Sequence, residues 1–228
     1  LSIRQRNDLT AKQQELIKLI LDRDTRVVFL SGPAGTAKTF VSVLAGLMLM
    51  DKKAVSDLTY VRSIIESASK SIGALPGEAG DKLEPFLRPL RDKLDEILPK
   101  AEVDKLIKDK RAEGLYVGHL RGASFNARFI LADEAQNLTG KELLTLVTRV
   151  GKFSKLIVAG DPGQSDCNGH SGFRKFCDLF NDEESRQNGV HYFSFTKDDI
   201  VRSNLVRFIV GRIEQQEVAK GEPMFPAK

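Results

Sequence analysis

Tryptophan is absent from this chain, and cysteine, histidine and aromatic residues are scarce. The 228 residues include two cysteines and three histidines, and aromatic residues make up 7% of the sequence. Cys167 and Cys177 form no CxxC pair, so we interpret them as free thiols in a reducing compartment, with a disulfide as the alternative. His119, His170 and His191 are far apart in the sequence, which favours ordinary polar histidines over a metal site.

Long apolar segments are also missing. The longest, residues 41–50, has ten residues and is interrupted by Ser42 and Gly46, whereas a membrane-spanning helix needs roughly 20. The first residues do not show the charged, apolar and small-residue order of a secretory signal peptide. We therefore expect no contact with a membrane and a location in the cytoplasm.

The composition is that of a folded domain. Apolar residues make up 41% and charged residues 29% of the chain, which excludes wholesale disorder and an integral membrane protein. The net charge of +4, from 35 basic and 31 acidic residues, is too small to indicate nucleic-acid binding by itself. We expect one domain over residues 1–216, with a helical insertion at about 78–112 and a C-terminal tail over 217–228.

Segments of strand character alternate with amphipathic helical segments along nearly the whole chain. The sequence predicts strands at residues 26–31, 58–61, 114–118, 128–132, 155–159 and 190–195. It predicts helices at residues 10–21, 38–50, 81–110 with a break at Pro99, 141–150, 172–180 and 198–216. This alternation predicts an α/β fold, a three-layer αβα sandwich around a mainly parallel sheet.

The strongest local motif lies between the first predicted strand and the helix at 38–50. It consists of Gly32, Pro33, Ala34, Gly35, Thr36, Ala37, Lys38 and Thr39. Small residues let the backbone bend around a phosphate chain and direct N–H groups at it, and the helix N-terminus adds partial positive charge. Lys38 can reach the β- and γ-phosphates, and the Thr39 hydroxyl can bind Mg²⁺. The motif therefore predicts a nucleotide-triphosphate site.

Ala37 stands where this motif has glycine. If the position needs a positive φ, alanine costs of order 1 kcal/mol of strain. Two alternatives follow from this departure: an active hydrolase with a strained loop, or a protein that binds nucleotide without hydrolysing it.

Two further motifs follow predicted strands. Asp133 and Glu134 come directly after the apolar residues 129–132, and Gln164 ends a turn at 160–164. Because ligands bind at the carboxyl ends of parallel strands, we expect Asp133 to hold Mg²⁺, through water, and Glu134 to orient and deprotonate the attacking water. Gln164 would sense the γ-phosphate or position that water. Together with the first motif, these residues favour nucleotide hydrolysis.

The combined motifs resemble the PhoH-like family of P-loop ATPases, which is related to the core of superfamily 1 helicases. The resemblance rests on GPAGTxKT at 32–39, LPG at 75–77, EPFLRPL at 84–90, LRG at 120–122, DEAQN at 133–137, LVTR at 146–149, GDPGQ at 160–164 with Asp166, and DIVR at 199–202. It implies a P-loop NTPase fold, ATP with Mg²⁺, an RNA-linked activity and ring-shaped homo-oligomers, hexamers above all. The compact form resembles versions that bacterial viruses encode.

The resemblance also implies roles for single residues. Gln13, in a stretch that resembles Thr-Pro-x-Gln, would read the adenine edge. Arg202 would stabilise charge on the transferring phosphoryl group, in cis or in trans, with an ordinary exposed arginine as the alternative. Arg62 follows the second predicted strand, where the family has Arg-Pro, and Arg121 would contact nucleic acid or a neighbouring subunit.

Three functions remain open at this point. The first is an ATPase that acts on, or is stimulated by, single-stranded nucleic acid, with RNA favoured. Its support includes a cluster of basic residues: Arg88, Arg91, Lys93, Lys100, Lys105, Lys108, Lys110 and Arg111. Acidic residues alternate with them, so the alternative interpretation is an ordinary solvent-exposed helix face. The second is a nucleotide-controlled assembly or signalling protein without helicase activity, and the third is the binder that does not hydrolyse.

Overall fold

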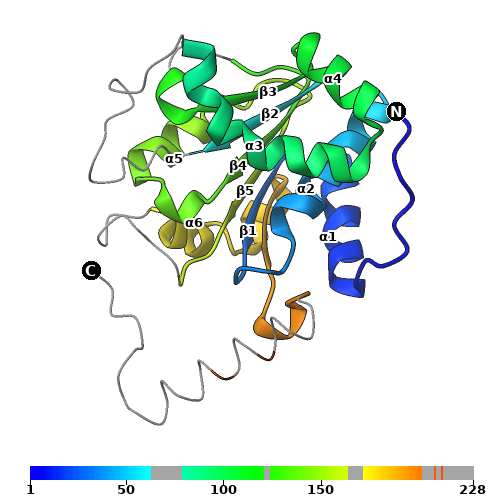
Figure 1. The fold of residues 1–228 in the computed structure, drawn as a ribbon. Coiled ribbons are helices and arrows are strands. Elements are labelled where there is room, and N and C mark those ends of the chain that lie inside the picture. The colour runs from blue at the N-terminus through cyan, green and yellow to red at the C-terminus, as the bar shows by residue number, and fades with distance from the viewer. Residues whose placement is uncertain (63–78, 121–123, 164–171, 202–207, 209–211, 213–228) are drawn as a thin grey trace.

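The structure is a computed structural model that describes residues 1–62, 79–120, 124–163 and 172–201, together with 208 and 212. At its centre is a six-stranded sheet in the order β3-β2-β4-β5-β1-β6 (Figure 1). The strands are β1 (Val27–Ser31), β2 (Asp57–Arg62), β3 (Ala112–Tyr116), β4 (Arg128–Asp133), β5 (Lys155–Gly160) and β6 (Val190–Ser194). Every pair of neighbouring strands is parallel. The predicted α/β fold with a mainly parallel sheet is confirmed.

Apolar residues fill both faces of the sheet, as expected for strands covered by helices on two sides. One face carries α1 (Ala11–Leu21), α2 (Lys38–Asp51), α3 (Ala79–Ile97) and α4 (Lys100–Lys108), and the other carries α5 (Gly140–Val147) and α6 (Phe173–Leu179). Successive residues of a strand point to opposite faces. Accordingly, Leu131 of β4 packs in the cluster with Leu47 of α2, whereas Ile130 packs in the cluster with Leu146 of α5.

Local sequence signals explain where the helices begin. The Thr10 hydroxyl accepts a hydrogen bond from the backbone N–H of Gln13 at 3.2 Å, and the Gln13 amide oxygen accepts one from the Thr10 N–H at 3.1 Å. This reciprocal pair is a capping box and confirms the predicted start of α1. The short helix α7 (Glu183–Gln187) was not predicted; Asp182 caps it, and the acids Glu183 and Glu184 stand in its first turn.

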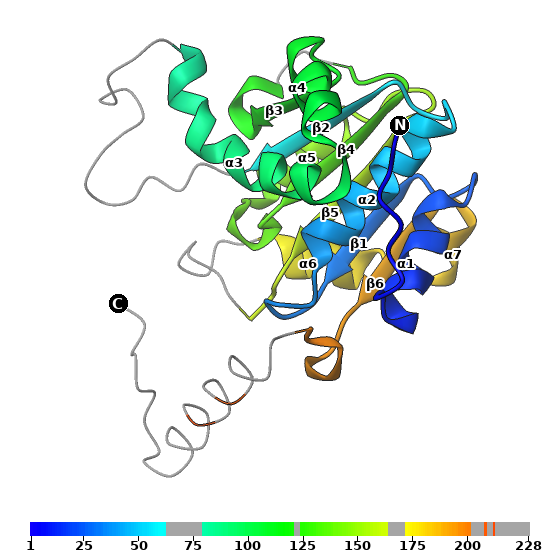
Figure 2. The same ribbon diagram turned by 45° about the vertical axis from the view of Figure 1, so that its right-hand side comes forward.

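The first residues of the chain cross the helices of one face, from α3 and α4 towards α1. Figure 2 shows this arm in dark blue in front of α2. The Arg4 N–H donates a hydrogen bond to the Ile97 carbonyl at 2.9 Å, and the Arg4 guanidinium donates one to the Asp95 carbonyl at 2.7 Å. The arm therefore ties the end of α3 to the core helices.

The chain leaves β6 close to the loop that follows β1. The Phe195 N–H donates a hydrogen bond to the Ser31 carbonyl at 2.8 Å, and the Val201 N–H donates one to the Gly35 carbonyl at 2.9 Å. A short 3₁₀ turn, η4 (Lys197–Asp199), lies between them. Of the predicted helix at 198–216, residues 198–201, 208 and 212 are described. Its predicted start is wrong, because Asp198 and Asp199 belong to this 3₁₀ turn and residues 200 and 201 are not helical. The rest of that segment and the tail at 217–228 lie outside the described residues. None of the described helices is both long and apolar enough to cross a bilayer.

Candidate functional site

The carboxyl ends of β1, β4 and β5 lie together at one edge of the sheet. β5 lies between β1 and β4, with Ser31 of β1 opposite Gly160 and Ala132 of β4 opposite Val158. Ligands of open α/β sheets bind at this edge. Because each of the three sequence motifs directly follows one of these strands, the fold brings the glycine-rich loop and the Asp133–Glu134 pair side by side.

The loop between β1 and α2 depends on small residues. A Cβ atom on Gly32 would stand 2.7 Å from the Cβ of Phe195, which is too close for any side chain. Gly35 has a φ of 87°, a conformation that residues with a Cβ rarely adopt. The Thr36 side chain is buried, and its hydroxyl donates a hydrogen bond to the Pro33 carbonyl at 2.9 Å. The backbone therefore curves tightly in front of the N-terminus of α2, where partial positive charge favours an anion.

Ala37 meets the condition under which alanine is strained. It is the N-cap residue of α2 and lies in the left-handed region, with φ 63° and ψ 28°. A non-glycine residue there costs of order 1 kcal/mol. The loop nevertheless has this conformation, so the departure from glycine affects stability and leaves the shape of the loop intact.

Lys38 begins α2 with its ammonium group folded over the loop. The Nζ atom donates hydrogen bonds to the carbonyl oxygens of Gly32 at 2.6 Å and Pro33 at 3.0 Å. Burial lowers the pKa of Lys38, and the acidic side chains nearby oppose that shift. The cation thus lies inside the curve of the loop, where a phosphate chain would replace backbone carbonyls as its partner.

Thr39, Tyr60 and Asp133 form a polar cluster from three different elements, in which Tyr60 and Asp133 are buried. The Thr39 hydroxyl donates to the two carboxylate oxygens of Asp133 at 3.1 and 3.0 Å, and the Tyr60 hydroxyl donates to Oδ2 at 2.7 Å. Asp133 is only 5% exposed. Burial raises the pKa of the Asp133 carboxyl, which the hydrogen bond from Tyr60 opposes, and burial also raises the pKa of Tyr60.

This cluster offers the oxygen ligands that Mg²⁺ prefers. A hydroxyl from α2 and a carboxylate from β4 converge within hydrogen-bonding distance, and both lie beside the glycine-rich loop. Mg²⁺ is commonly held by one or two carboxylates while phosphate oxygens and waters complete its shell. Within the described part of the chain, no group of three or more His, Cys, Asp or Glu side chains forms a metal site of its own. Thr39 and Asp133 therefore fit a cation that arrives with a nucleotide.

Glu134 follows Asp133 in a backbone conformation that turns its side chain towards the same edge. Its φ of 54° and ψ of 41° lie in the left-handed region, which is uncommon for glutamate and is found at functional sites. The Arg62 guanidinium at the end of β2 lies 3.7 Å from Glu134 Oε1. The Gln136 amide donates a hydrogen bond to Glu134 Oε2 at 2.6 Å. Two neighbours on different elements therefore orient this carboxylate.

Gln136 is a site residue that our reasoning from the sequence did not assign. It is 3% exposed, and its amide oxygen accepts a hydrogen bond from the backbone N–H of Asp161 at 3.0 Å. A Cβ atom on Gly160 would stand 3.0 Å from that same oxygen, so glycine lets Gln136 approach the end of β5. Gln136 links Glu134 to the third strand end. The sequence did contain one signal for this role, because Gln136 is an amide residue only two positions after Glu134.

A cavity of about 260 Å³ brings these residues together. It is lined by residues of the loop, the start of α2, the ends of β4 and β5, and one residue of α3: Ala34, Gly35, Ala37, Lys38, Thr39, Phe40, Lys93, Asp133, Glu134, Gly160 and Asp161. A cation, a hydroxyl and two adjacent carboxylates around one hollow can bind a phosphate chain with a divalent cation and activate a water beside it.

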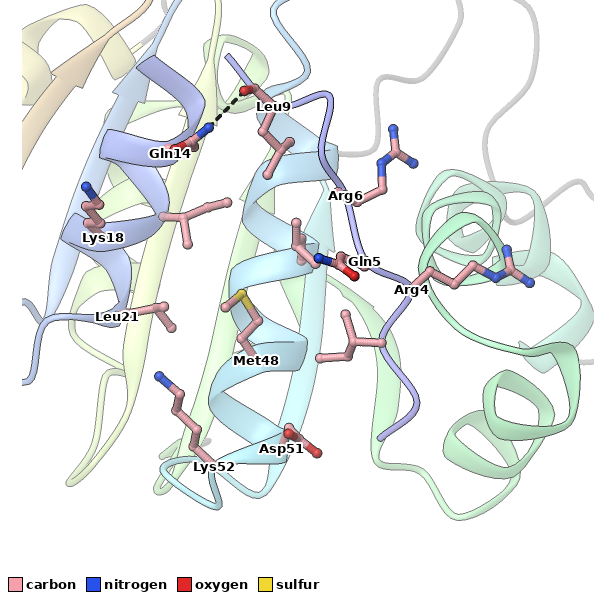
Figure 3. Close-up of a pocket in the computed structure, with 13 residues that line it drawn as sticks. Arg4, Gln5, Arg6, Leu9, Gln14, Lys18, Leu21, Met48, Asp51 and Lys52 are labelled. Carbon is pink, nitrogen blue, oxygen red and sulfur yellow. Dashed lines mark hydrogen bonds between the residues drawn. The ribbon is translucent and has the colours of Figure 1, made fainter. Parts of the chain in front are cut away.

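A larger hollow, of about 570 Å³, lies elsewhere (Figure 3). It is bounded by the N-terminal arm, α1 and the second half of α2, including Leu21, Met48 and Lys52. Its lining mixes apolar side chains with polar and charged ones. It contains neither the glycine-rich loop nor the acidic pair, so it is not the candidate active site.

The remaining predicted residues fall in two groups. Gln13 is 3% exposed, and beside its capping role its amide donates to the Thr36 carbonyl at 3.4 Å, so it joins α1 to the glycine-rich loop. Gln164 and Arg202, with Arg121, lie outside the described residues. Val201, the residue before Arg202, donates its backbone hydrogen bond to the Gly35 carbonyl of the glycine-rich loop.

Acidic partners neutralise part of the basic cluster on α3 and α4. The Arg91 guanidinium lies 2.8 Å from Asp104 Oδ1, and the Lys93 ammonium lies 2.7 Å from Glu96 Oε1. These pairs agree with a solvated helix face in this part of the surface.

The strand order, the glycine-rich loop and the acids after β4 define a P-loop NTPase fold. The large terminase of a thermophilic bacteriophage has this architecture: it matches with a TM-score of 0.52 and 15% identity over 91% of this chain and 50% of that chain. Another crystal form of that terminase, in complex with ADP, matches with a TM-score of 0.52 and 14% identity over 90% of this chain and 50% of that chain. At these identities the likeness concerns the fold alone.

The chain belongs to the PhoH-like protein family, whose family model matches residues 5–214. A PhoH-like protein of Synechocystis sp. is 34% identical over 210 residues, which cover 91% of this chain and 62% of that protein. A PhoH-like protein of Mycobacterium tuberculosis is also 34% identical over 210 residues, covering 91% of this chain and 58% of that protein. The chain therefore spans less than two thirds of these relatives. The resemblance to the family is confirmed.

Proposed function

We propose that this protein binds ATP with Mg²⁺ and hydrolyses it to ADP and phosphate. The observation that carries the proposal is that Lys38, Thr39, Asp133 and Glu134 line one cavity of about 260 Å³. Each of these side chains has a chemical role in phosphoryl transfer. The choice of adenine nucleotide is supported by the family resemblance and by the ADP complex of the terminase with a similar fold.

Binding of the phosphate chain is the task of the loop and Lys38. The backbone N–H groups of residues 34–38 and the N-terminus of α2 favour an anion in the curve of the loop. The Lys38 ammonium exchanges the Gly32 and Pro33 carbonyls for phosphate oxygens. Thr39 and Asp133 hold Mg²⁺, which neutralises charge on the phosphates when it is bound.

Hydrolysis is the task of Glu134. Its carboxylate accepts a proton from the attacking water, while the new bond between the water oxygen and the γ-phosphorus forms and the bond to the β-phosphate oxygen breaks. Arg62 and Gln136 orient the carboxylate for this transfer. Gln164 positions the water, and Arg202 stabilises charge on the phosphoryl group, from the same subunit or from a neighbour.

The wider function that we propose is ATP hydrolysis coupled to single-stranded nucleic acid, with RNA favoured, by a homo-oligomeric ring, a hexamer above all. The family resemblance and the basic side chains of α3 and α4 support it. Gln13 would read adenine within the domain expected at 1–216, and the protein would work in the cytoplasm. The relatives named above are bacterial, so an origin in a bacterial virus stays a prediction.

The second candidate is a protein whose assembly is controlled by nucleotide, without helicase activity. The ion pairs Arg91–Asp104 and Lys93–Glu96 favour it, because they reduce the free positive charge on the helical insertion. Strand separation by a single core of this fold would also require neighbouring subunits.

Phosphate release with and without single-stranded RNA, measured together with the solution mass, tests these proposals. We expect Mg²⁺-dependent release of phosphate, and faster release with RNA if the first candidate is correct. Lys38→Ala should abolish nucleotide binding, whereas Glu134→Gln should bind ATP normally and hydrolyse it roughly 10²–10⁴-fold more slowly. Equal turnover in Glu134→Gln and the parent would remove Glu134 from the mechanism. A mass that changes with ATP, without any response to RNA or single-stranded DNA, would favour the second candidate.

A further inference from the structure

A second cavity, of about 380 Å³, adjoins the candidate active site. It is lined by Thr39, Arg62, Arg88, Pro89, Asp92, Lys93, Asp133 and Glu134. Four of these residues, Thr39, Lys93, Asp133 and Glu134, also line the cavity of the glycine-rich loop. Lys93 is the residue of the helical insertion that faces both.

The packing of α3 places Lys93 at this position. Leu90, Leu94 and Ile97 are buried against the core helices, so they define the inward stripe of α3. At 3.6 residues per turn, Lys93 falls on one side of that stripe and Arg91 on the other. Arg91 accordingly pairs with Asp104 of α4, whereas Lys93 lines the same cavity as the active-site carboxylates. The same helix therefore carries Lys93 and Arg88 towards these two cavities and Arg91 away from them.

The partner of Lys93 in this structure is one that a phosphate can replace. Its ammonium lies 2.7 Å from Glu96 Oε1, one turn along the same helix, and the two side chains are 31% and 46% exposed. Exposed ion pairs of this kind contribute little to stability. A terminal phosphate carries more negative charge than a carboxylate, and charge-assisted hydrogen bonds to it are among the stronger ones.

We propose that the Lys93 ammonium breaks its ion pair with Glu96 and contacts the terminal phosphate when ATP is bound. This inference rests on the proposed function and adds a catalytic residue from the helical insertion. Lys38 belongs to the loop and α2, whereas Lys93 belongs to α3, so the terminal phosphate is held between two elements. ADP lacks that phosphate. Lys93 therefore distinguishes ATP from ADP.

The test compares two nucleotides on matched variants. The dissociation constants of a non-hydrolysable ATP analogue and of ADP, each with Mg²⁺, are measured by calorimetry for the parent, Lys93→Ala, Lys93→Arg and Arg91→Ala. We expect Lys93→Ala to weaken the ATP analogue roughly 10- to 100-fold, as for loss of a hydrogen bond to a charged group, and to leave ADP within about twofold. Lys93→Arg should recover most of the loss, and Arg91→Ala should change neither constant.

The outcomes separate this inference from the proposed function. If Lys93→Ala weakens both nucleotides equally, or neither, Lys93 does not contact the terminal phosphate and the inference is wrong, while ATP binding stands. If the parent itself binds neither nucleotide, the proposed function fails and the inference fails with it. Thermal unfolding of Lys93→Ala should match the parent, because only an exposed pair is lost.

Discussion

The Thr39 hydroxyl and the Asp133 carboxylate, 94 positions apart in the sequence, are hydrogen-bonded at 3.0 and 3.1 Å. This contact joins the first turn of the helix after the glycine-rich loop to the end of β4. It exists because β5 alone separates β1 from β4 in the sheet. The two oxygen-bearing side chains thereby converge beside Lys38, where a nucleotide-bound cation would be held.

Thr39 should determine how much Mg²⁺ the protein needs. Thr39→Val keeps the shape of the side chain and removes the hydroxyl, so the Mg²⁺ concentration for half-maximal ATP hydrolysis should rise roughly tenfold or more. Thr39→Ser retains the oxygen and should resemble the parent. Titration of phosphate release with Mg²⁺ measures both. Removal of divalent cations with a chelator should stop hydrolysis in all three proteins.

Gln136 should affect turnover more than nucleotide binding. Gln136→Ala removes the hydrogen bond that orients Glu134, so kcat should fall roughly 10- to 100-fold while KM for ATP stays within about twofold. Gln14→Ala is the matched control, because that exposed glutamine lies away from the acidic pair and donates to the Leu9 carbonyl at 3.0 Å. A KM that rises in step with the fall in kcat would contradict a positioning role for Gln136.

Ala37→Gly should stabilise the protein. Relief of the left-handed strain, about 1–2 kcal/mol, exceeds the entropy that glycine adds to the unfolded chain, about 0.4–1 kcal/mol. The free energy of unfolding from urea titration should therefore rise by up to about 1.6 kcal/mol. Ala101→Gly, in the first turn of α4, should have the opposite sign, because glycine is a poor helix former. The turnover of Ala37→Gly also tells whether the strain slows hydrolysis.

Cys177 should make stability fall at alkaline pH. Burial raises the pKa of its thiol from 9.0 to about 12, so the folded protein holds this proton more tightly than the unfolded chain. The stabilisation is complete below about pH 9 and is lost as the pH rises towards about 12. Urea titrations at several pH values, parent against Cys177→Ala, measure this difference. In a Cys167→Ser background, iodoacetamide should label Cys177 slowly at about pH 8.5, near the ordinary thiol pKa, unless urea is added.

The order of strands and helices could be read from the sequence because its signals are local. Apolar runs predicted all six strands to within a few residues, and Thr10 with Gln13 predicted the start of α1. α7 was missed because five residues with no buried side chain carry no apolar periodicity. The sequence predicted that β3 begins at residue 114, two residues after its actual start at Ala112. This strand lies at the edge of the sheet, where its apolar pattern is weaker.

The sequence by itself was enough to locate the glycine-rich loop with Lys38 and Thr39, and the acidic pair Asp133–Glu134 after a strand. These features could be located because each depends on residues that are neighbours in the chain. Only the tertiary structure decided which distant groups surround them. Gln136 reaches Asp161, Tyr60 donates to Asp133, and Lys93 of α3 lines the same cavity. These contacts depend on the order of strands in the sheet and on the side of α3 that packs inward, and both are set by long-range burial of apolar surface.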